Sequence, residues 1–466
     1  MTNDLLIRDV LDRDPSQASL QNDGVSKVEN TATLHYELST FVCDGEYEAG
    51  MIRILEAYLA GLHKPSQPSA WVSGFYGSGK SHLVKVLEAL WRNDPPINGQ
   101  LPRDIAQLPD DIRQLLTEVS VEAKRAGGSW SASGMLSESG DKSVRMLILG
   151  IVYRAAGLSS DVGRAQFRLW VRQRGWEEEI IRRVTEKGLD PEDEFDQYLV
   201  SPEIAEAVHE LSGAKSTDAD TAQERWDLQF NRPDRSIDEF VKALREVLLL
   251  QSEDKKQIPL TLLVLDEAQQ YIGQSGDRAQ AMQEAVERIQ SAFDSRVLVV
   301  ATGQNALTAT ANLQKLMGRF TVNVNLSDKD VEEVVRKVVL RKKPQYEQQV
   351  KAAINSVEGE IDRQLRSSRI GAKNEDRDYL VADYPLLPVR SRFWAAVLHA
   401  LDTTGTSAQL RSQLRIAHSA AAHVAGQPIG HVITGDFIFD QISSGLQQSG
   451  TLPREVATLI SDQSSG

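Results

Sequence analysis

The stretch WVSGFYGSGKSHLVKVLEALW, residues 71–91, decides the fold of this chain. Residues 74–81 within it match the phosphate-loop pattern G-x-x-x-x-G-K-[ST] in full. Glycines let the backbone adopt positive φ and bring its N–H groups against phosphate oxygens, and the helix that follows adds the positive end of its dipole. The stretch therefore predicts a strand over 70–73, a nucleotide-binding loop, and an amphipathic helix that begins near Ser81.

The loop supplies the groups that a nucleoside triphosphate with Mg²⁺ requires. Lys80 is expected to reach the β- and γ-phosphates, and the Ser81 hydroxyl to ligate Mg²⁺. ATP is favoured over GTP because the chain lacks the base-reading N-K-x-D element of GTPases. The expected nucleotide-binding residues in and beside the loop are Gly74, Phe75, Tyr76, Gly77, Ser78, Gly79, Lys80, Ser81 and His82.

A second motif lies in IPLTLLVLDEAQQYIG, where the apolar run 262–265 ends in Asp266 and Glu267. An apolar strand with two acids at its carboxyl end is the Walker B arrangement, and ligands of parallel sheets collect at that end. We expect Asp266 to hold Mg²⁺ and Glu267 to act as the general base on the attacking water. The alternative is a strand that ends in a solvated acidic turn.

Two further segments carry candidate sensors of the nucleotide. SRVLVVATGQNAL predicts a strand over 297–301, and a polar residue after it, Gln304 first and Asn305 second, is expected to bond the attacking water or the γ-phosphate. Arg319 precedes an alternating strand over 320–326, and in an oligomer it is expected to reach a neighbour's γ-phosphate in trans. An ordinary salt bridge at Arg319 is the alternative.

Composition limits the setting of the protein. The chain has 466 residues and a net charge of -14, which argues against a protein that coats nucleic acid non-specifically. Cys43 is the single cysteine, so no internal disulfide can form and a reducing compartment fits. The N-terminus lacks the apolar core of a signal peptide and no apolar run reaches the length of a membrane span, so a cytoplasmic location with no membrane partner is expected.

The order of these elements resembles an AAA+ ATPase. It predicts an α/β P-loop NTPase with a parallel sheet flanked by helices, a long helical insertion, and a C-terminal helical lid. The expected boundaries are 1–65 for a mostly helical N-terminal segment, 66–327 for the core with an insertion at about 157–235, and 328–466 for the lid. In the lid, Arg411 is the preferred second sensor over Arg415, and a solvated surface arginine is the alternative.

The segments LIRDVLDRDP, GVSKVEN, HYELSTFV and WVSGFYGSGKSHLVKVL resemble the beginning of the BrxC-like P-loop ATPases of BREX (bacteriophage exclusion) systems, which are related to PglY. The family's chains are much longer, so this chain corresponds to an N-terminal AAA+ portion or to a short relative. The resemblance implies a role in antiphage defence and host-DNA modification, with other BREX proteins such as the methyltransferase as partners.

Three functions remain open from the sequence. The first is an Mg²⁺-dependent ATPase that works as a self-assembled oligomer. The second is an ATP-dependent assembly switch or scaffold that hydrolyses little and recruits DNA-acting partners. The third is direct DNA contact through the basic runs at 363–373 and 341–343, for which a solvated charged face is the alternative, and DNA contact through partners also stays open.

Overall fold

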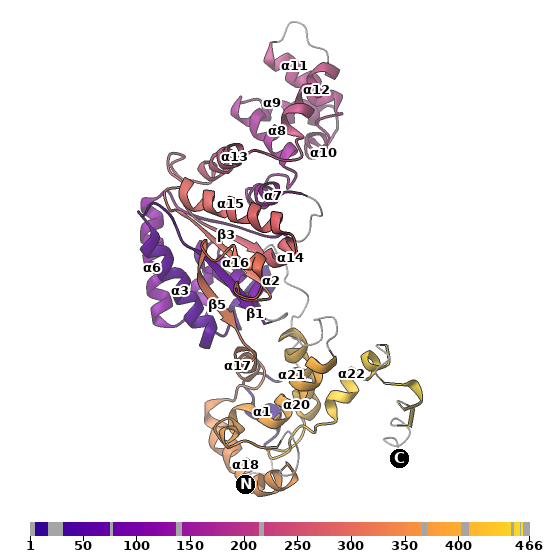
Figure 1. The fold of residues 1–466 in the computed structure, drawn as a ribbon. Helices are drawn as coiled ribbons and strands as arrows, with labels where there is room; N and C mark the ends of the chain where they lie inside the picture. The colour runs from indigo at the N-terminus through magenta and orange to yellow at the C-terminus, as the bar shows by residue number, and fades with distance from the viewer. Residues whose placement is uncertain are drawn as a thin grey trace.

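A five-stranded parallel sheet forms the centre of the protein in a computed structural model (Figure 1). The structure describes residues 5–16, 31–74, 78–136, 142–213, 219–365, 371–401, 410–448, 452–456 and 458–459. The strand order is β2-β3-β4-β1-β5, and every neighbouring pair is parallel. The strands are β1 (Ser69–Gly74), β2 (Ser129–Met135), β3 (Leu260–Asp266), β4 (Val297–Gly303) and β5 (Phe320–Leu326).

The strand order places β4 between β1, which leads into the phosphate loop, and β3, which ends in the acidic pair. All five carboxyl ends lie at the same edge because the strands are parallel. Ser73 is paired with Gly303, and Leu265 with Ala301, so the ends of β1, β4 and β3 are level. This parallel sheet flanked by helices, with a helical insertion and a helical C-terminal part, confirms the predicted α/β fold class.

Both faces of the sheet are buried, as expected for parallel strands. Alternate side chains of β1 point to opposite faces: Trp71 joins one apolar cluster, while Ala70 and Val72 join the other. The helices that cover the Trp71 face are α7 (Val144–Ala155), α13 (Ile237–Leu250), α14 (Ala268–Ile272), α15 (Gly276–Ala292) and α16 (Ala311–Gln314). The helices of the other face are α2 (Thr31–Ser39), α3 (Gly45–Gly61), α4 (Lys80–Arg92), α5 (Pro102–Ile105) and α6 (Asp110–Arg125).

The N-terminal part of the chain packs partly on the sheet and partly in the C-terminal lid. Residues 31–62 form two helices on the sheet, α2 and α3. The break between them ends at the N-cap Asp44, whose side chain accepts a hydrogen bond from the Gly45 N–H. By contrast, α1 (Ile7–Val10) is buried in the apolar cluster of the lid. Backbone hydrogen bonds hold this first segment on both sides, from Ile7 N–H to the Gln427 carbonyl and from Asp12 N–H to the Arg341 carbonyl.

The predicted insertion is helical and projects from the core at the top of Figure 1. Its helices are α8 (Val162–Gln173), α9 (Glu177–Glu186), α10 (Pro191–Asp196), α11 (Pro202–Ser212) and α12 (Ala219–Phe230). Phe167 is fully buried at its centre, where it stacks on Tyr198 at 4.4 Å and contacts Trp226 at 4.9 Å between ring centroids. The insertion therefore has an aromatic core separate from the sheet.

The lid follows β5 directly and lies at the bottom of Figure 1. Its helices are α17 (Asp328–Val338), η1 (Pro344–Tyr346), α18 (Glu347–Leu365), η2 (Asn374–Asp378), α19 (Leu380–Asp383), α20 (Pro388–Leu401), α21 (Leu410–Val424) and α22 (Phe437–Gln448). Among the described parts of the chain, no helix has both the length and the apolar character to span a bilayer.

Candidate nucleotide site

The phosphate loop joins β1 to α4, as the motif predicts. Gly74 ends β1 and Gly79 caps the N-terminus of α4 with φ 87° and ψ 11°, a left-handed conformation that favours glycine. The helix begins at Lys80, one residue before the predicted start. Phe75, Tyr76 and Gly77, which the sequence also assigns to nucleotide binding, lie outside the described residues.

Lys80 is the cation of the site. Its Nζ donates a hydrogen bond to the Gly74 carbonyl at 2.8 Å, so the side chain folds back toward the end of β1. Burial lowers the pKa of Lys80 from 10.5 to about 8, and the negative charges of Asp266 and Glu267 oppose this shift. The three side chains therefore lie within electrostatic range of one another, which brings the two sequence motifs into one site.

The loop contains features that fit the binding of an anion. Ser78 is fully buried and its Oγ has no hydrogen-bond partner. Buried hydroxyls are normally paired, so this unpartnered group indicates a ligand contact. A Cβ added at Gly74 would clash with Ser78 Oγ and lie 3.0 Å from the Leu326 carbonyl oxygen, so the loop needs glycine at this position for close packing. These features fit a phosphate group held against the loop.

The tip of β3 is fixed by its neighbour β4. The Thr302 hydroxyl donates a hydrogen bond to Asp266 Oδ1. The Glu267 N–H lies 3.0 Å from both Asp266 Oδ1 and Thr302 Oγ1. Glu267 itself has φ 56° and ψ 30°, a left-handed conformation that is uncommon and costly for a glutamate. This left-handed residue lies between the end of the strand and the start of α14.

The residues expected to bind Mg²⁺ come from the end of one strand and the start of one helix. Asp266 ends β3, and Ser81, half-buried, lies in the first turn of α4 beside the phosphate loop. The described residues contain no group of three or more His, Cys, Asp or Glu side chains that would hold a metal ion without other ligands. A hydroxyl with one carboxylate is a donor set that suits Mg²⁺ completed by phosphate oxygens and water.

Thr302 is the residue that the sequence reasoning missed at the tip of β4. It is 1% exposed and bonded to Asp266, whereas the favoured Gln304 and the second choice Asn305 are both exposed. The Asn305 backbone is used structurally, since its N–H donates to Gln269 Oε1 at 2.8 Å and its carbonyl accepts from Trp71 Nε1 at 3.0 Å. The pairing register of β3 with β4 is the signal that identifies Thr302.

Arg319 lies at the other edge of the sheet from the nucleotide site. It precedes Phe320, which is paired with Ser69 at the start of β1, so it is at the amino ends of the strands. Its guanidinium forms an ion pair with Glu287 of α15 at 2.6 Å. Within one chain Arg319 therefore forms an ordinary salt bridge, which is the alternative that the sequence left open. A contact with a neighbour's nucleotide stays a prediction.

The remaining predicted residues are placed as follows. His82 is half-buried in α4 and its ring lies 5.6 Å from that of Phe41. Arg411 belongs to α21, but its side chain lies outside the described residues, and Arg415 is exposed on the same helix. The basic run 341–343 does not form a solvated stripe, because Lys342 is 6% exposed and its Nζ donates to the Ala382 carbonyl at 2.6 Å. That candidate DNA surface is therefore wrong for Lys342.

No protein-family model matches this chain. Among solved structures, the Aeropyrum pernix ORC1 protein in complex with DNA is similar to it at 13% sequence identity, with 86% of this chain and 83% of that chain covered and a TM-score of 0.27.

Proposed function

We propose that this chain binds Mg·ATP between the phosphate loop and the β3 tip, and hydrolyses it. Two observations carry the proposal: the charges of Asp266 and Glu267 act on the buried Lys80, and the Ser78 hydroxyl in the same loop is buried without a partner. A buried cation with a lowered pKa gains a strong partner when a triphosphate arrives, because phosphate oxygens replace the lost water.

The proposed roles follow from the positions of the side chains. Lys80 binds and orients the phosphates, and Asp266, held by Thr302, is placed to ligate the metal with Ser81. When bound, Mg²⁺ neutralises charge on the phosphates. Glu267, which follows Asp266 at the end of β3, would accept a proton from the attacking water.

The proposal is tested by two measurements on purified protein. Isothermal titration with Mg·ATP measures binding, and phosphate release measures turnover, in the unmodified chain and in Lys80→Ala and Glu267→Gln. Binding that is lost in Lys80→Ala and kept in Glu267→Gln, with turnover lost in both, supports the ATPase. If the unmodified chain binds no Mg·ATP, the site is wrong.

A second candidate is an ATP-dependent assembly switch, in which Arg319 would act in trans after its ion pair with Glu287 opens. Since each chain holds its own Arg319 in this pair, a completed trans site would first require a neighbour to compete with Glu287. Size-exclusion elution with and without Mg·ATP, compared with single-turnover kinetics, distinguishes the two. Assembly driven by ATP with negligible turnover favours the switch.

We also propose that the biological setting is a BREX-type antiphage complex. This proposal is supported by the resemblance of the N-terminal segments and the phosphate-loop variant to the BrxC-like ATPases, with the methyltransferase and DNA as candidate partners. Co-purification of the chain with the products of neighbouring genes tests the setting. A phage-challenge assay with Lys80→Ala as the inactive control tests the role.

A further inference from the structure

The first turn of α3 contacts three parts of the molecule that are far apart in sequence. Asp44, its N-cap, forms an ion pair with Lys337 of the lid helix α17. Glu46 Oε1 accepts a hydrogen bond from the Asn325 N–H at 3.2 Å, near the end of β5. The Tyr47 hydroxyl donates to the Ser78 carbonyl of the phosphate loop at 2.6 Å.

On the side of the sheet, Asp44 and Tyr47 are each fixed by contacts within or beside α3. Asp44 is fixed by its own capping hydrogen bond to the Gly45 N–H at 2.8 Å. Tyr47 is 2% exposed and its ring packs edge-on against Phe41 at 6.1 Å between centroids. Ser78 belongs to the phosphate loop, and its buried hydroxyl has no hydrogen-bond partner, so Tyr47 bonds a residue of the proposed nucleotide site. A shift of the loop on nucleotide binding would therefore move the Tyr47 hydroxyl.

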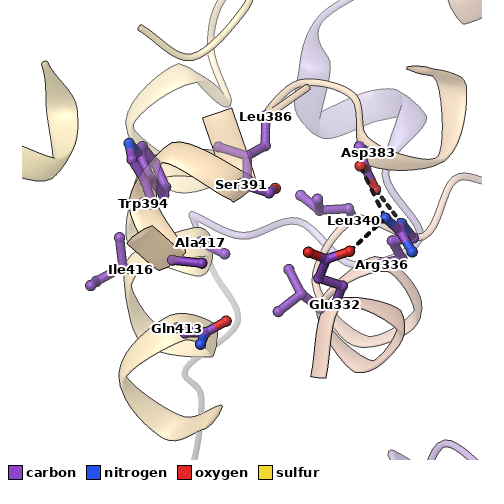
Figure 2. Close-up of a pocket in the computed structure, with 12 residues that line it drawn as sticks. Glu332, Arg336, Leu340, Asp383, Leu386, Ser391, Trp394, Gln413, Ile416 and Ala417 are labelled. Carbon is purple, nitrogen blue, oxygen red and sulfur yellow. Dashed lines mark hydrogen bonds and ion pairs between the residues drawn. The ribbon is translucent and has the colours of Figure 1, made fainter. Parts of the chain in front are cut away.

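The lid side of the contact is equally anchored. Arg336, next to Lys337, forms ion pairs with Asp383 and, at 3.4 Å, with Glu332, beside a lid cavity of about 30 Å³ (Figure 2). Asp383 is 2% exposed, and its burial raises its pKa. Removing one partner of a buried charge pair is strongly destabilising, so α17 is fixed to the rest of the lid at Arg336. Lys337 therefore moves with the lid.

We propose that Asp44, Tyr47 and Lys337 are positioning residues that couple the phosphate loop to the lid through the first turn of α3. The proposal rests on the proposed function, since the event it transmits is binding of Mg·ATP. The first turn of α3 bonds both the phosphate loop and the lid, so nucleotide binding at the loop can shift the equilibrium position of the lid. By linkage, the position of the lid then changes nucleotide affinity by the same factor. None of the three residues touches the reacting atoms.

The test measures lid position and nucleotide binding separately. Cysteines at Arg113 in α6 and Gln348 in α18, in a Cys43→Ala background, carry a donor and an acceptor dye, and both positions are exposed. Mg·ATP affinity is measured by titration on the same samples. The variants are Tyr47→Phe, which keeps the ring, Asp44→Asn, which keeps a capping oxygen, and Lys337→Met. Lys337→Arg tests rescue.

Lys187→Met is the matched control, because Lys187 forms a surface ion pair with Glu206 at 2.8 Å in the insertion, away from the junction. We expect Mg·ATP to change the dye distance in the unmodified chain and in Lys187→Met. In Tyr47→Phe and Lys337→Met the change is lost, and the KM for ATP rises by about 2- to 30-fold with a smaller effect on kcat. The double variant Tyr47→Phe/Lys337→Met is expected to raise the KM for ATP no more than the more severe single variant does. Lys337→Arg is expected to retain the change in dye distance.

Two outcomes overturn the coupling while leaving the ATPase intact. The first is a chain that binds Mg·ATP with no change in dye distance. The second is additive effects of Tyr47→Phe and Lys337→Met, which would mean that each residue only stabilises its own neighbourhood. Absence of Mg·ATP binding in the unmodified chain would instead overturn the proposed function together with the coupling that rests on it.

Discussion

The hydroxyl of Thr302 donates a hydrogen bond to the carboxylate of Asp266, and this contact joins the tips of β4 and β3. Asp266 Oδ1 also accepts from the Glu267 N–H, so one carboxylate oxygen has two donors. These two hydrogen bonds do not use its other oxygen, Oδ2. Strand β4, which lies between β3 and β1, therefore helps to position Asp266, the proposed metal ligand, and the backbone of Glu267, the proposed general base.

Replacing Thr302 by Val should weaken both the fold and the site. The hydroxyl is buried, and a hydrogen bond to a charged group contributes about 1.5–3 kcal/mol, so the free energy of unfolding should fall by that amount. The apparent affinity for Mg²⁺ should fall as well, because Asp266 loses its orientation. Denaturant unfolding and Mg²⁺ titration of phosphate release measure these effects. Thr302→Ser keeps the hydroxyl and should behave like the unmodified chain; equal losses in both variants would contradict this role.

Glu267→Gln should separate binding from hydrolysis. The amide keeps the shape of the side chain but cannot accept the proton, so turnover should fall by roughly 10²- to 10⁴-fold while Mg·ATP affinity changes little. Phosphate release under single-turnover conditions is the measurement. Glu253→Gln, an exposed glutamate in the turn before β3, is the control. Hydrolysis that survives in Glu267→Gln would assign the base to another residue.

The pH dependence of ATP binding should follow Lys80. Because burial lowers its pKa to about 8, the free protein loses this charge as pH rises through 8, earlier than an exposed lysine would. If the complex requires protonated Lys80, Mg·ATP affinity should fall about tenfold between pH 7 and pH 9. The same shift means that the folded state binds fewer protons than the unfolded state between pH 8 and 10.5, so stability from this group rises with pH across that window.

Titration calorimetry at several pH values measures this slope. Lys80→Arg is the control, since a guanidinium stays charged throughout and should give weaker binding with a flatter profile. A steep fall in affinity that is unchanged in Lys80→Arg would assign the titration to a different group.

Gly74→Ala should abolish nucleotide binding without unfolding the chain. The added methyl would clash with Ser78 Oγ and press on the Leu326 carbonyl, so the loop must move away from its phosphate-binding form. Thermal shift with Mg·ATP should disappear while far-UV circular dichroism is kept. At Gly359 in α18 an added Cβ meets nothing within 4 Å, so Gly359→Ala should keep binding and stabilise the helix by about 0.5–1 kcal/mol. Normal binding by Gly74→Ala would show that the loop tolerates the side chain.

Arg319 and Glu287 should affect activity in opposite directions if the arginine acts in trans. Arg319→Ala should bind Mg·ATP but lose turnover by roughly 10³-fold or more, the scale of an arginine finger. Glu287→Gln weakens the pair that holds Arg319 within its own chain, so turnover should be kept or raised. Mixing Arg319→Ala with Glu267→Gln should restore some activity, because a mixed assembly contains some sites with both groups intact. No restoration at any mixing ratio would favour a purely structural salt bridge.

The sequence by itself determined the groups that are neighbours along the chain. The phosphate-loop pattern with Lys80, and the acidic pair after the apolar run of β3, are local signals, and the structure places both at the carboxyl edge of one parallel sheet. The helical character of the insertion at about 157–235 was also predicted, and the structure shows five helices between Val162 and Phe230. These features depend on periodicity and on short motifs.

Only the tertiary structure decided which distant residues complete the site. Thr302 meets Asp266 across 36 positions because β4 pairs with β3, and a register displaced by one residue would turn its side chain to the other face. Tyr47 meets Ser78 because α3 packs beside the phosphate loop, and α1 lies in the lid because its apolar residues find their partners there. Such contacts depend on strand order and on the packing of surfaces from distant segments, and neither quantity is encoded in any local stretch of residues.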